Sequence, residues 1–292
     1  GGRASVLPPT FVAYCNKRKG ISRPLKMKAG VPTMDAARRA PNVRYGTLAV
    51  RIGGKSFADA TGRRHDVLGE ISFTAGAGEI LALLAPSGTG KTTILRIVLG
   101  LEKNFAGDVR LPEGRLGVMF QEPRLLPWLT VGDNLRLVVG PGAGADMGEI
   151  SPLLALVGLS GTEPLHPKAL SLGMARRVAL VRALIGHPKL LVLDEPFASL
   201  DPKSATGLAQ LISNAARRDG ALVLLSTHNL DPVLGCADRV LVLAGKPARL
   251  AADWPTGVGT PAGGGVAGRL IKQRLLTRFP FLGAAAEEED AP

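Results

Sequence analysis

Four short and almost entirely apolar runs constrain the fold of this chain more than any other feature of its sequence. They are EILALLA (79–85), KLLVLD (189–194), ALVLLS (221–226) and RVLVLA (239–244). A run of this length without polar alternation predicts a strand that is buried on both faces, as in parallel sheets covered by helices. Further predicted strands are LAVRI (48–52), ISFTA (71–75) and RLGVMF (115–120). We therefore expect an α/β fold with a mostly parallel sheet.

Helices are expected between these strands. KTTILRIVLG (91–100) directly follows the first apolar run, which gives a strand–loop–helix unit. A second helix is predicted over 201–218, because Asp201 is a good N-cap and Pro202 suits the first helical position. Residues 131–187 are mainly helical in pattern and interrupt the alternation of strands and helices. This block predicts an inserted helical subdomain, which we place at about residues 122–187.

The positive charge of the chain is concentrated at its front. The 292 residues carry a formal net charge of +12. Residues 1–51 hold 11 Lys or Arg and one acid, whereas residues 52–292 hold 25 Lys or Arg and 23 acids. The folded part is therefore nearly neutral, which weakens the argument for a nucleic-acid or membrane surface. The chain opens with Gly-Gly rather than Met, which fits a fragment, and Met34 is another candidate for the natural start.

Composition also suggests the domain boundaries. Residues 1–45 are rich in Pro, Gly, Arg and Lys without a sustained period, and we expect them to be disordered. A folded domain is predicted over 46–251. The C-terminal tail, 252–292, is rich in Gly and Pro and contains a short basic amphipathic stretch, GRLIKQRLLTRF (268–279).

Two cysteines at no metal-binding spacing imply neither a disulfide framework nor a cysteine-ligated metal site. No apolar run reaches the roughly 18 residues that a membrane span requires, and the front of the chain has no uninterrupted apolar segment typical of a secretion signal. We therefore expect any work at a membrane to be done through a partner protein.

The stretch APSGTGKTT (85–93) predicts a phosphate-binding loop. Successive backbone N–H groups in such a loop form a concavity for phosphate oxygens, and the helix that follows adds partial positive charge. Lys91 would reach the β- and γ-phosphates, and the Thr92 hydroxyl would bind Mg²⁺. The remaining nucleotide-binding positions of this stretch are Pro86, Ser87, Gly88, Thr89, Gly90 and Thr93. Ala85 replaces the usual first glycine, a slight change unless that position requires a positive φ.

A pair of acids ends the second apolar run, in LLVLDEP (190–196). Asp194 stands at the end of the strand, where a carboxylate can hold the Mg²⁺ shell directly or through water. Glu195 follows it and can act as a general base that polarises an attacking water. Together with the phosphate-binding loop, this pair predicts hydrolysis of a nucleoside triphosphate.

The ordered set of motifs over about residues 47–250 resembles the nucleotide-binding subunit of an ABC transporter. APSGTGKTT resembles Walker A and LLVLDEP resembles Walker B. LSLGM (170–174) resembles the family signature, with Leu172 in place of a glycine. The other matches are an adenine-stacking aromatic at Phe57, the Q-loop glutamine at Gln121, the D-loop at SLD (199–201) and the switch histidine at His228.

This resemblance implies a P-loop NTPase core with an antiparallel β subdomain and an inserted α-helical signature subdomain. It further implies ATP and Mg²⁺ as cofactors, with Glu195, His228 and Gln121 as catalytic residues and Thr92, Gln121 and Asp194 around the metal. Two subunits would close on two ATP molecules, as a homodimer or with a related ATPase subunit. Ser171 and Gly173 of one subunit, together with Asp201, would then meet the nucleotide held by the other. The side chain of Leu172 must point away from that nucleotide.

The stretch QEPRLLPWLTVGDNL (121–135) resembles the importer branch that serves nitrate, sulfonates and taurine. The resemblance implies a membrane permease subunit as partner, with apolar residues around PRLLPWLTV, such as Leu126 and Trp128, forming a groove for it. It also implies a periplasmic binding protein in the same system and a peripheral position on the cytoplasmic face of the bacterial inner membrane. No nucleic acid is expected as a partner.

Three other functions stay open at this point. A soluble ABC ATPase that acts on nucleic acid would agree with the basic front end, but long coiled coils and a second cassette are missing from the sequence. A non-enzymatic, regulatory ABC-like subunit would explain Ala85 and Leu172, but it disagrees with the retention of Lys91, Glu195 and His228. An ATPase subunit of another transporter class, serving lipids, metals or export, shares all of the motifs.

Overall fold

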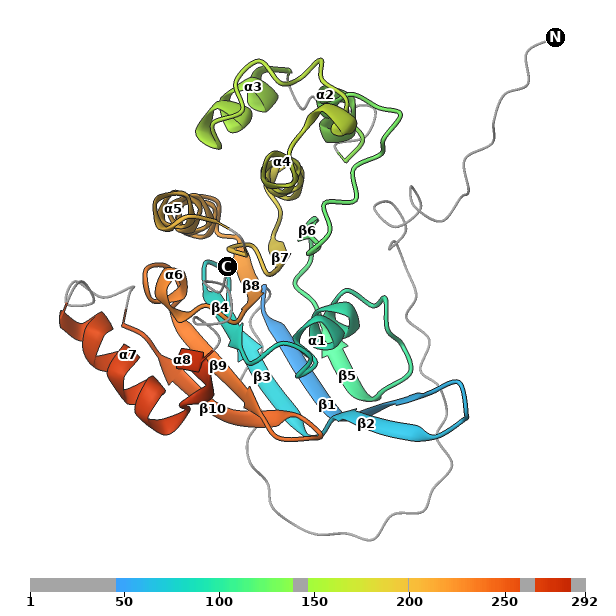
Figure 1. Ribbon diagram of the computed structural model, residues 1–292, viewed down its shortest axis with the longest axis vertical. Helices are drawn as coiled ribbons and strands as arrows, with labels where there is room; N and C mark the ends of the chain where they lie inside the picture. Colours follow the sequence, from blue (N-terminus) through green and yellow to red (C-terminus); the bar gives the residue numbers. More distant parts are fainter. Residues whose placement is uncertain (1–45, 139–146, 199, 258–265, 285–292) are drawn as a thin grey trace, which may run out of the picture. The chain divides into compact units, whose positions relative to one another are not determined.

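The computed structural model describes residues 46–138, 147–198, 200–257 and 266–284, all within the unit Tyr45–Pro292 (Figure 1). The basic segment predicted to be disordered, residues 1–45, lies outside the described residues, as does Ser199 of the D-loop.

Two sheets form the framework of this unit. The larger sheet has the order β10-β9-β4-β8-β7-β6, and its members are β4 (Ile80–Leu84), β6 (Leu116–Met119), β7 (Leu190–Asp194), β8 (Leu222–Thr227), β9 (Arg239–Ala244) and β10 (Arg249–Pro255). All neighbours in it are parallel except β9 and β10. The smaller sheet is antiparallel and consists of β1 (Leu48–Ala58), β2 (Arg64–Leu68), β3 (Ile71–Ala75) and β5 (Ala106–Arg110). The predicted α/β class, with its parallel core and antiparallel part, is confirmed.

The apolar runs are explained by burial on both faces of the larger sheet. In β4, Leu81 and Leu83 belong to one hydrophobic core, while Ile80, Ala82 and Leu84 belong to the other. The strands β7, β8 and β9 divide their side chains between the two cores in the same alternating way. The first core also contains α1 (Lys91–Val98) and the inner face of the antiparallel sheet, so that α1 is enclosed between the two sheets.

The second core is covered by the other helices. These are α2 (Val131–Arg136), α3 (Met147–Leu156), α4 (Leu172–Leu184), α5 (Pro202–Asp219), α6 (Leu230–Leu234), α7 (Val266–Arg278) and α8 (Phe281–Ala284), together with a 3-10 turn at Pro167–Ala169. Helices α2, α3 and α4 lie close together beyond the end of β6 and β7 (Figure 1). They fall within the range 122–187 that the sequence indicates as an inserted helical subdomain. Helix α5 begins as predicted, with Asp201 as N-cap and Pro202 at its start.

Several elements were not predicted from the sequence. Strands β2 and β5 are largely exposed and carry few apolar residues, so neither shows the pattern of a buried strand. Strand β10 pairs with β9 at the sheet edge and runs to Pro255, into the range that the sequence assigns to the tail.

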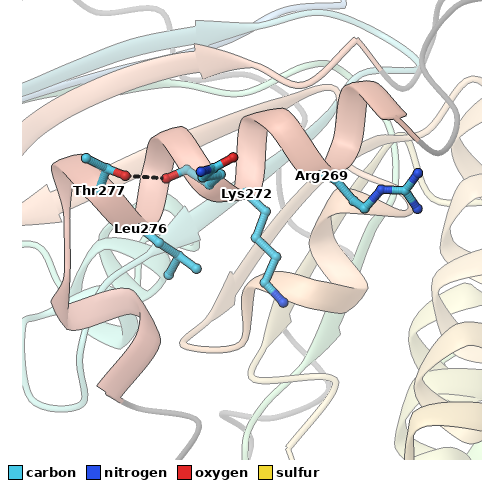
Figure 2. A pocket seen from close by; sticks show the side chains of 5 residues that line it. Arg269, Lys272, Leu276 and Thr277 are labelled. Atoms are coloured by element: carbon cyan, nitrogen blue, oxygen red, sulfur yellow. Dashed lines mark hydrogen bonds between the residues drawn. The ribbon is translucent and has the colours of Figure 1, made fainter.

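The basic amphipathic stretch of the tail forms α7. Leu275 is fully buried in the second core, and α7 continues through Phe279 to α8, whose Leu282 is also buried. A shallow hollow runs along α7 and is lined by Arg269, Lys272, Gln273, Leu276 and Thr277 (Figure 2). None of the predicted site residues lines this hollow. No helix in the described part of the chain combines the length and apolarity of a membrane span.

Candidate functional site

The register of the parallel sheet brings three functional loops to one edge. Strand β8 lies between β4 and β7, with Leu84 paired to Thr227 and Asp194 paired to Ser226. The phosphate-binding loop therefore leaves β4 beside His228, which follows β8, and beside Glu195, which follows β7. Carboxyl ends of adjacent parallel strands are the usual ligand-binding edge of an open α/β sheet.

The phosphate-binding loop has the backbone that an anion cradle requires. Gly88 and Gly90 have φ of 75° and 107°, in the region that glycine adopts without strain. A Cβ at Gly90 would also lie 2.7 Å from Leu68 Cδ2. Gly90 is the N-cap of α1 and provides no side chain to its first turn, so the N–H groups there are available to an anion. Ala85 is not among the described non-glycine residues with positive φ, so the methyl group adds no backbone strain.

Lys91 is held at the centre of the site. It is 5% exposed, and its Nζ donates to the Ala85 carbonyl at 2.7 Å and the Pro86 carbonyl at 3.3 Å. The same ammonium lies 3.1 Å from Glu195 Oε1. A buried ammonium needs such partners, and a phosphate group with its larger negative charge can replace them. The structure thus shows Lys91 paired with the carboxylate that the sequence identifies as the general base.

Asp194 and Thr92 form the predicted metal position. Thr92 Oγ1 lies 3.3 Å from Asp194 Oδ1, and Asp194 Oδ1 also accepts a 2.6 Å hydrogen bond from Ser226 Oγ. Among the described residues there is no group of three or more His, Cys, Asp or Glu side chains that could hold a metal ion. One carboxylate and one hydroxyl fit Mg²⁺, which takes few protein ligands and completes its shell with phosphate oxygens and water. Sequence reasoning missed Ser226, which orients Asp194.

Glu195 occupies a constrained position between Lys91 and His228. Its φ is 50°, and its N–H is held by the carbonyl and the hydroxyl oxygen of Ser226, both at 3.1 Å. Its Oε2 lies 3.0 Å from His228 Nδ1, and its Oε1 faces Lys91. Burial alone would raise the pKa of Glu195, but the hydrogen bond with His228 and the charge of Lys91 outweigh it and lower that pKa. A non-glycine residue at positive φ costs on the order of 1–3 kcal/mol, and such strain is common at functional sites.

The signature segment, residues 170–174, is built differently. Ser171 is the N-cap of α4, and its Oγ accepts the Met174 N–H at 3.2 Å. Ser171 is exposed, and so is Leu172, at 60%. A Cβ at Gly173 would meet nothing closer than Ser171 Oγ at 4.0 Å, so the space beside this helix start is open. In this chain the segment makes no hydrogen bond to the Lys91–Glu195–His228 cluster among the described contacts.

The remaining predicted site residues lie on other elements and make no hydrogen bond to the cluster among the described contacts. Gln121 is exposed and follows β6, whose Met119 is paired with Leu193 next to Asp194. Phe57 is 41% exposed near the end of β1. Asp201 caps α5 by accepting the N–H groups of Lys203 and Ser204, and the hydrogen bond from the Ser204 hydroxyl, followed by these N–H groups, lowers its pKa. Thr89 braces the phosphate-binding loop by donating to the Pro86 carbonyl at 2.8 Å, whereas Ser87 is exposed.

The loop at 122–130 is anchored by two side chains that the sequence did not indicate. Buried Asn134 accepts the Leu126 N–H at 2.7 Å and donates to the carbonyls of Leu126, Leu129 and Thr130. Arg182 of α4 donates to the carbonyls of Pro123 and Arg124, both at 2.8 Å, and burial lowers the pKa of its guanidinium. With its backbone fixed in this way, the loop presents Trp128 at 60% exposure.

Comparison with known proteins relates this geometry to a family. Residues 68–198 match the family model for the ABC transporter. The chain is 44% identical over 214 residues to the aliphatic sulfonates import ATP-binding protein SsuB 2 of Pseudomonas syringae pv. tomato. The aligned region covers 73% of this chain and 89% of that relative. It is 40% identical over 222 residues to SsuB 2 of Burkholderia lata, over 74% of this chain and 79% of the relative.

Solved structures agree in fold. A dimeric ATP-binding cassette in a post-hydrolysis state with ADP and Pi has a TM-score of 0.64 and 24% identity, covering 71% of this chain and 98% of that one. A dimeric bacterial ABC transporter cassette has the same TM-score at 22% identity, with the same coverage. At this level of identity the likeness supports the fold, and the closer sequence relatives carry the family assignment.

Proposed function

Because this chain belongs to the ABC transporter family, as one of its ATP-binding proteins, we propose that it is the ATPase subunit of a bacterial uptake system for an aliphatic sulfonate. The importer branch that the sequence resembles also serves nitrate, but the named relatives favour sulfonates, a class that includes taurine. The observation that carries the proposal is the buried Lys91–Glu195–His228 cluster beside Asp194, in a chain 44% identical to a sulfonate-import ATP-binding protein.

Binding of ATP would exchange the partners of Lys91. In the structure its ammonium neutralises Glu195, and the triphosphate offers it the β- and γ-phosphate oxygens instead. The helix start at Gly90 and the N–H groups of residues 87–93 would hold the same oxygens. Departure of Lys91 removes a positive charge that lowers the pKa of Glu195, so that this pKa rises toward its ordinary range. Glu195 thereby becomes a stronger base when the substrate is in place.

Hydrolysis would then proceed by in-line attack of water on the γ-phosphorus. Glu195 accepts one proton of the water, and the water oxygen bonds to the γ-phosphorus. The bond from the γ-phosphorus to the oxygen that bridges the β- and γ-phosphates breaks, which leaves ADP and Pi. His228, which lies 3.0 Å from Glu195, would hold the carboxylate and the γ-phosphate in line. Thr92, Asp194 and Gln121 would hold Mg²⁺, which would offset the negative charge of the phosphate groups.

A second subunit would complete each ATP site. The exposed Ser171 and the half-buried Gly173, at the start of α4, suit the γ-phosphate of a nucleotide bound to the partner, since a helix N-terminus favours anions. Asp201 would lie at the same interface. Leu172 does not block this contact if its side chain keeps the exposed position that it has here. The partner subunit is a second copy of this chain or a related ATPase subunit.

The anchored loop at 122–130 would receive the membrane permease subunit. An exposed tryptophan on a fixed backbone is typical of the residues that dominate protein interfaces. We place the assembly at the cytoplasmic face of the bacterial inner membrane, with a periplasmic binding protein delivering the sulfonate. A role on nucleic acid would instead be supported by ATP hydrolysis that DNA stimulates.

Uptake tests the proposal directly. In a bacterial strain where this chain is the only ATPase subunit for the permease, growth on ethanesulfonate as the sole sulfur source should require Glu195 and should stop in Glu195→Gln. Trp128→Glu should also stop growth, while the purified variant keeps its basal ATP hydrolysis. Growth that continues in Glu195→Gln, or growth restored only on nitrate as the sole nitrogen source, would contradict the proposed role.

A further inference from the structure

One face of the Phe57 ring is covered by a lysine. Lys55 and Phe57 are two positions apart on β1 and project to the same side of the strand. Lys55 Nζ lies 4.2 Å from the centroid of the Phe57 ring, within the range of a cation–π contact. Phe57 is nevertheless 41% exposed. A partly open aromatic ring supported from beneath by a cation is suited to stacking.

The lysine is anchored far more firmly than a surface lysine. Lys55 is 5% exposed, and its Nζ lies 3.1 Å from Glu102 Oε1 and donates to the Asn104 carbonyl at 2.7 Å. Glu102 is itself fixed, because it also accepts the Asn104 N–H at 3.0 Å. The hydrogen bond from Lys55 is the largest of the causes that lower the pKa of Glu102. The ammonium therefore has two oxygen partners and one ring, and little freedom to move.

This arrangement stands beside the phosphate-binding loop. Strand β2 pairs with β1 so that Leu68 is opposite Lys55 and His65 is opposite Phe57. The side chains of Val67 and Leu68 fill the space next to Gly90 of the loop. Phe57 is two residues beyond Lys55 on β1, so its position lies about 7 Å further along the strand. The loop that supplies Glu102 follows α1, the helix that begins at Lys91.

We propose that Lys55 is a positioning residue for nucleotide binding, which fixes the Phe57 ring so that its open face stacks on the adenine of ATP. The inference rests on the proposed ATP site and deepens it. Lys55 does not touch the nucleotide. It holds the ring in one orientation, through the cation–π contact on one face, and so reduces the freedom that stacking on the other face must remove. Lys55 therefore contributes to the affinity for a ligand that carries an adenine base, and it contributes nothing to the affinity for a ligand made of phosphates alone.

The test compares ATP with inorganic tripolyphosphate as ligands of the purified chain, by calorimetry. Phe57→Ala should weaken ATP binding about tenfold, the effect of losing one stacked base. Lys55→Met keeps the aliphatic stem without the charge and should weaken ATP binding about fivefold. In the Phe57→Ala background, Lys55→Met should change the Kd for ATP less than about twofold, because the pair acts as a unit. Tripolyphosphate binding should be the same in all of these proteins.

Matched variants separate positioning from folding. Lys103→Met removes an exposed lysine from the same loop and should leave both ligands unaffected. Lys55→Arg keeps the cation and should restore most of the ATP affinity. If Lys55→Met does not fold, Glu102→Gln makes the same test by removing the anchor of the ammonium, with a smaller base-dependent loss expected.

Two results would overturn the inference. One is equal weakening of ATP and tripolyphosphate by Lys55→Met, which would mean that the lysine supports the fold. The other is unchanged ATP binding in Phe57→Ala, which would remove the base platform itself. Wild-type protein that binds neither ligand would instead refute the proposed ATP site as a whole.

Discussion

The phosphate-binding cluster and the signature segment are the two halves of one proposed catalytic site, and the chain builds them in opposite ways. Lys91, Asp194 and Glu195 are each less than a tenth exposed, and they are connected through Thr92, Ser226 and His228. Ser171 and Leu172 are exposed, and among the described contacts the Ser171 side chain hydrogen-bonds only to the Met174 N–H, as the cap of α4.

This difference shows where each half obtains its order. The cluster is positioned by the register of three buried parallel strands, so its geometry exists before any ligand arrives. The signature segment has a prepared helix start, and among the described residues only Ser171 Oγ would lie within 4.0 Å of a Cβ at Gly173. Under the proposed function, a second subunit would complete this surface.

Loss of Lys91 should have the largest effect, because it breaks the buried half. Lys91→Met removes the ammonium that would bind the phosphates and leaves Glu195 with His228 alone. Charge-assisted hydrogen bonds to two phosphates are worth about 3 kcal/mol, so the affinity for ATP should fall about 100-fold or more. Titration with a fluorescent ATP analogue measures this, and thermal melting shows whether the variant is folded. Wild-type affinity in a folded Lys91→Met protein would mean that the cluster is structural.

Removal of the Ser171 hydroxyl should affect the open half and leave the buried half intact. Ser171→Ala should preserve ATP binding by the single subunit and lower ATP hydrolysis about tenfold, through a lost contact to the partner's γ-phosphate. Thr130→Ala is the matched control, because Thr130 caps α2 in the same helical region. Each variant should lose about 1 kcal/mol of stability from its missing cap. Equal hydrolysis by the two variants would contradict a role for Ser171 beyond capping.

Substitution of His187 should give the smallest effect, because this residue lies in neither half and connects α3 with α5. It lies 3.2 Å from Glu149 of α3 and 3.3 Å from Asp219 of α5, and these hydrogen bonds raise its pKa. The stabilisation is complete below the ordinary His pKa and disappears as the pH rises through the raised value. His187 is largely exposed, so screening limits the pair to less than about 1 kcal/mol.

Thermal melting of His187→Gln measures this connection. We expect a melting temperature about 1–2 °C below that of the wild type at pH 6 and a difference near zero at pH 8.5. A difference that grows toward high pH would mean that the neutral imidazole, and not its charge, holds α3 and α5 together.

Much of the core could be predicted from the sequence because its signals are local. Unbroken apolar runs indicate strands buried on two faces, and Gly90 followed by Lys91 indicates a loop that opens a helix. Asp201 and Pro202 mark the start of α5 by side-chain chemistry alone. The pairing of Lys91 with Glu195 and His228 follows once the strands are placed side by side.

Other features depend on contacts between distant residues and leave no local signal. Strand β2 has the sequence RHDVL and is ordered by its pairing with β1. Asn134 and Arg182 look like ordinary polar residues of a helix until they meet the carbonyls of the 122–130 loop. Ser226 is the last residue but one of the buried strand β8, and only the neighbouring strand β7 shows that it orients Asp194.

The most direct test of the two-half account is the size of Glu195→Gln in solution, with and without ATP and Mg²⁺. The substitution should block hydrolysis and leave ATP binding intact, which traps the closed state. We predict a monomer without nucleotide and a dimer with ATP and Mg²⁺, and the dimer should be lost again when Ser171→Ala is added. A Glu195→Gln protein that binds ATP and stays monomeric at concentrations well above its Kd for ATP would contradict the assignment of the exposed signature segment to a second copy of this chain.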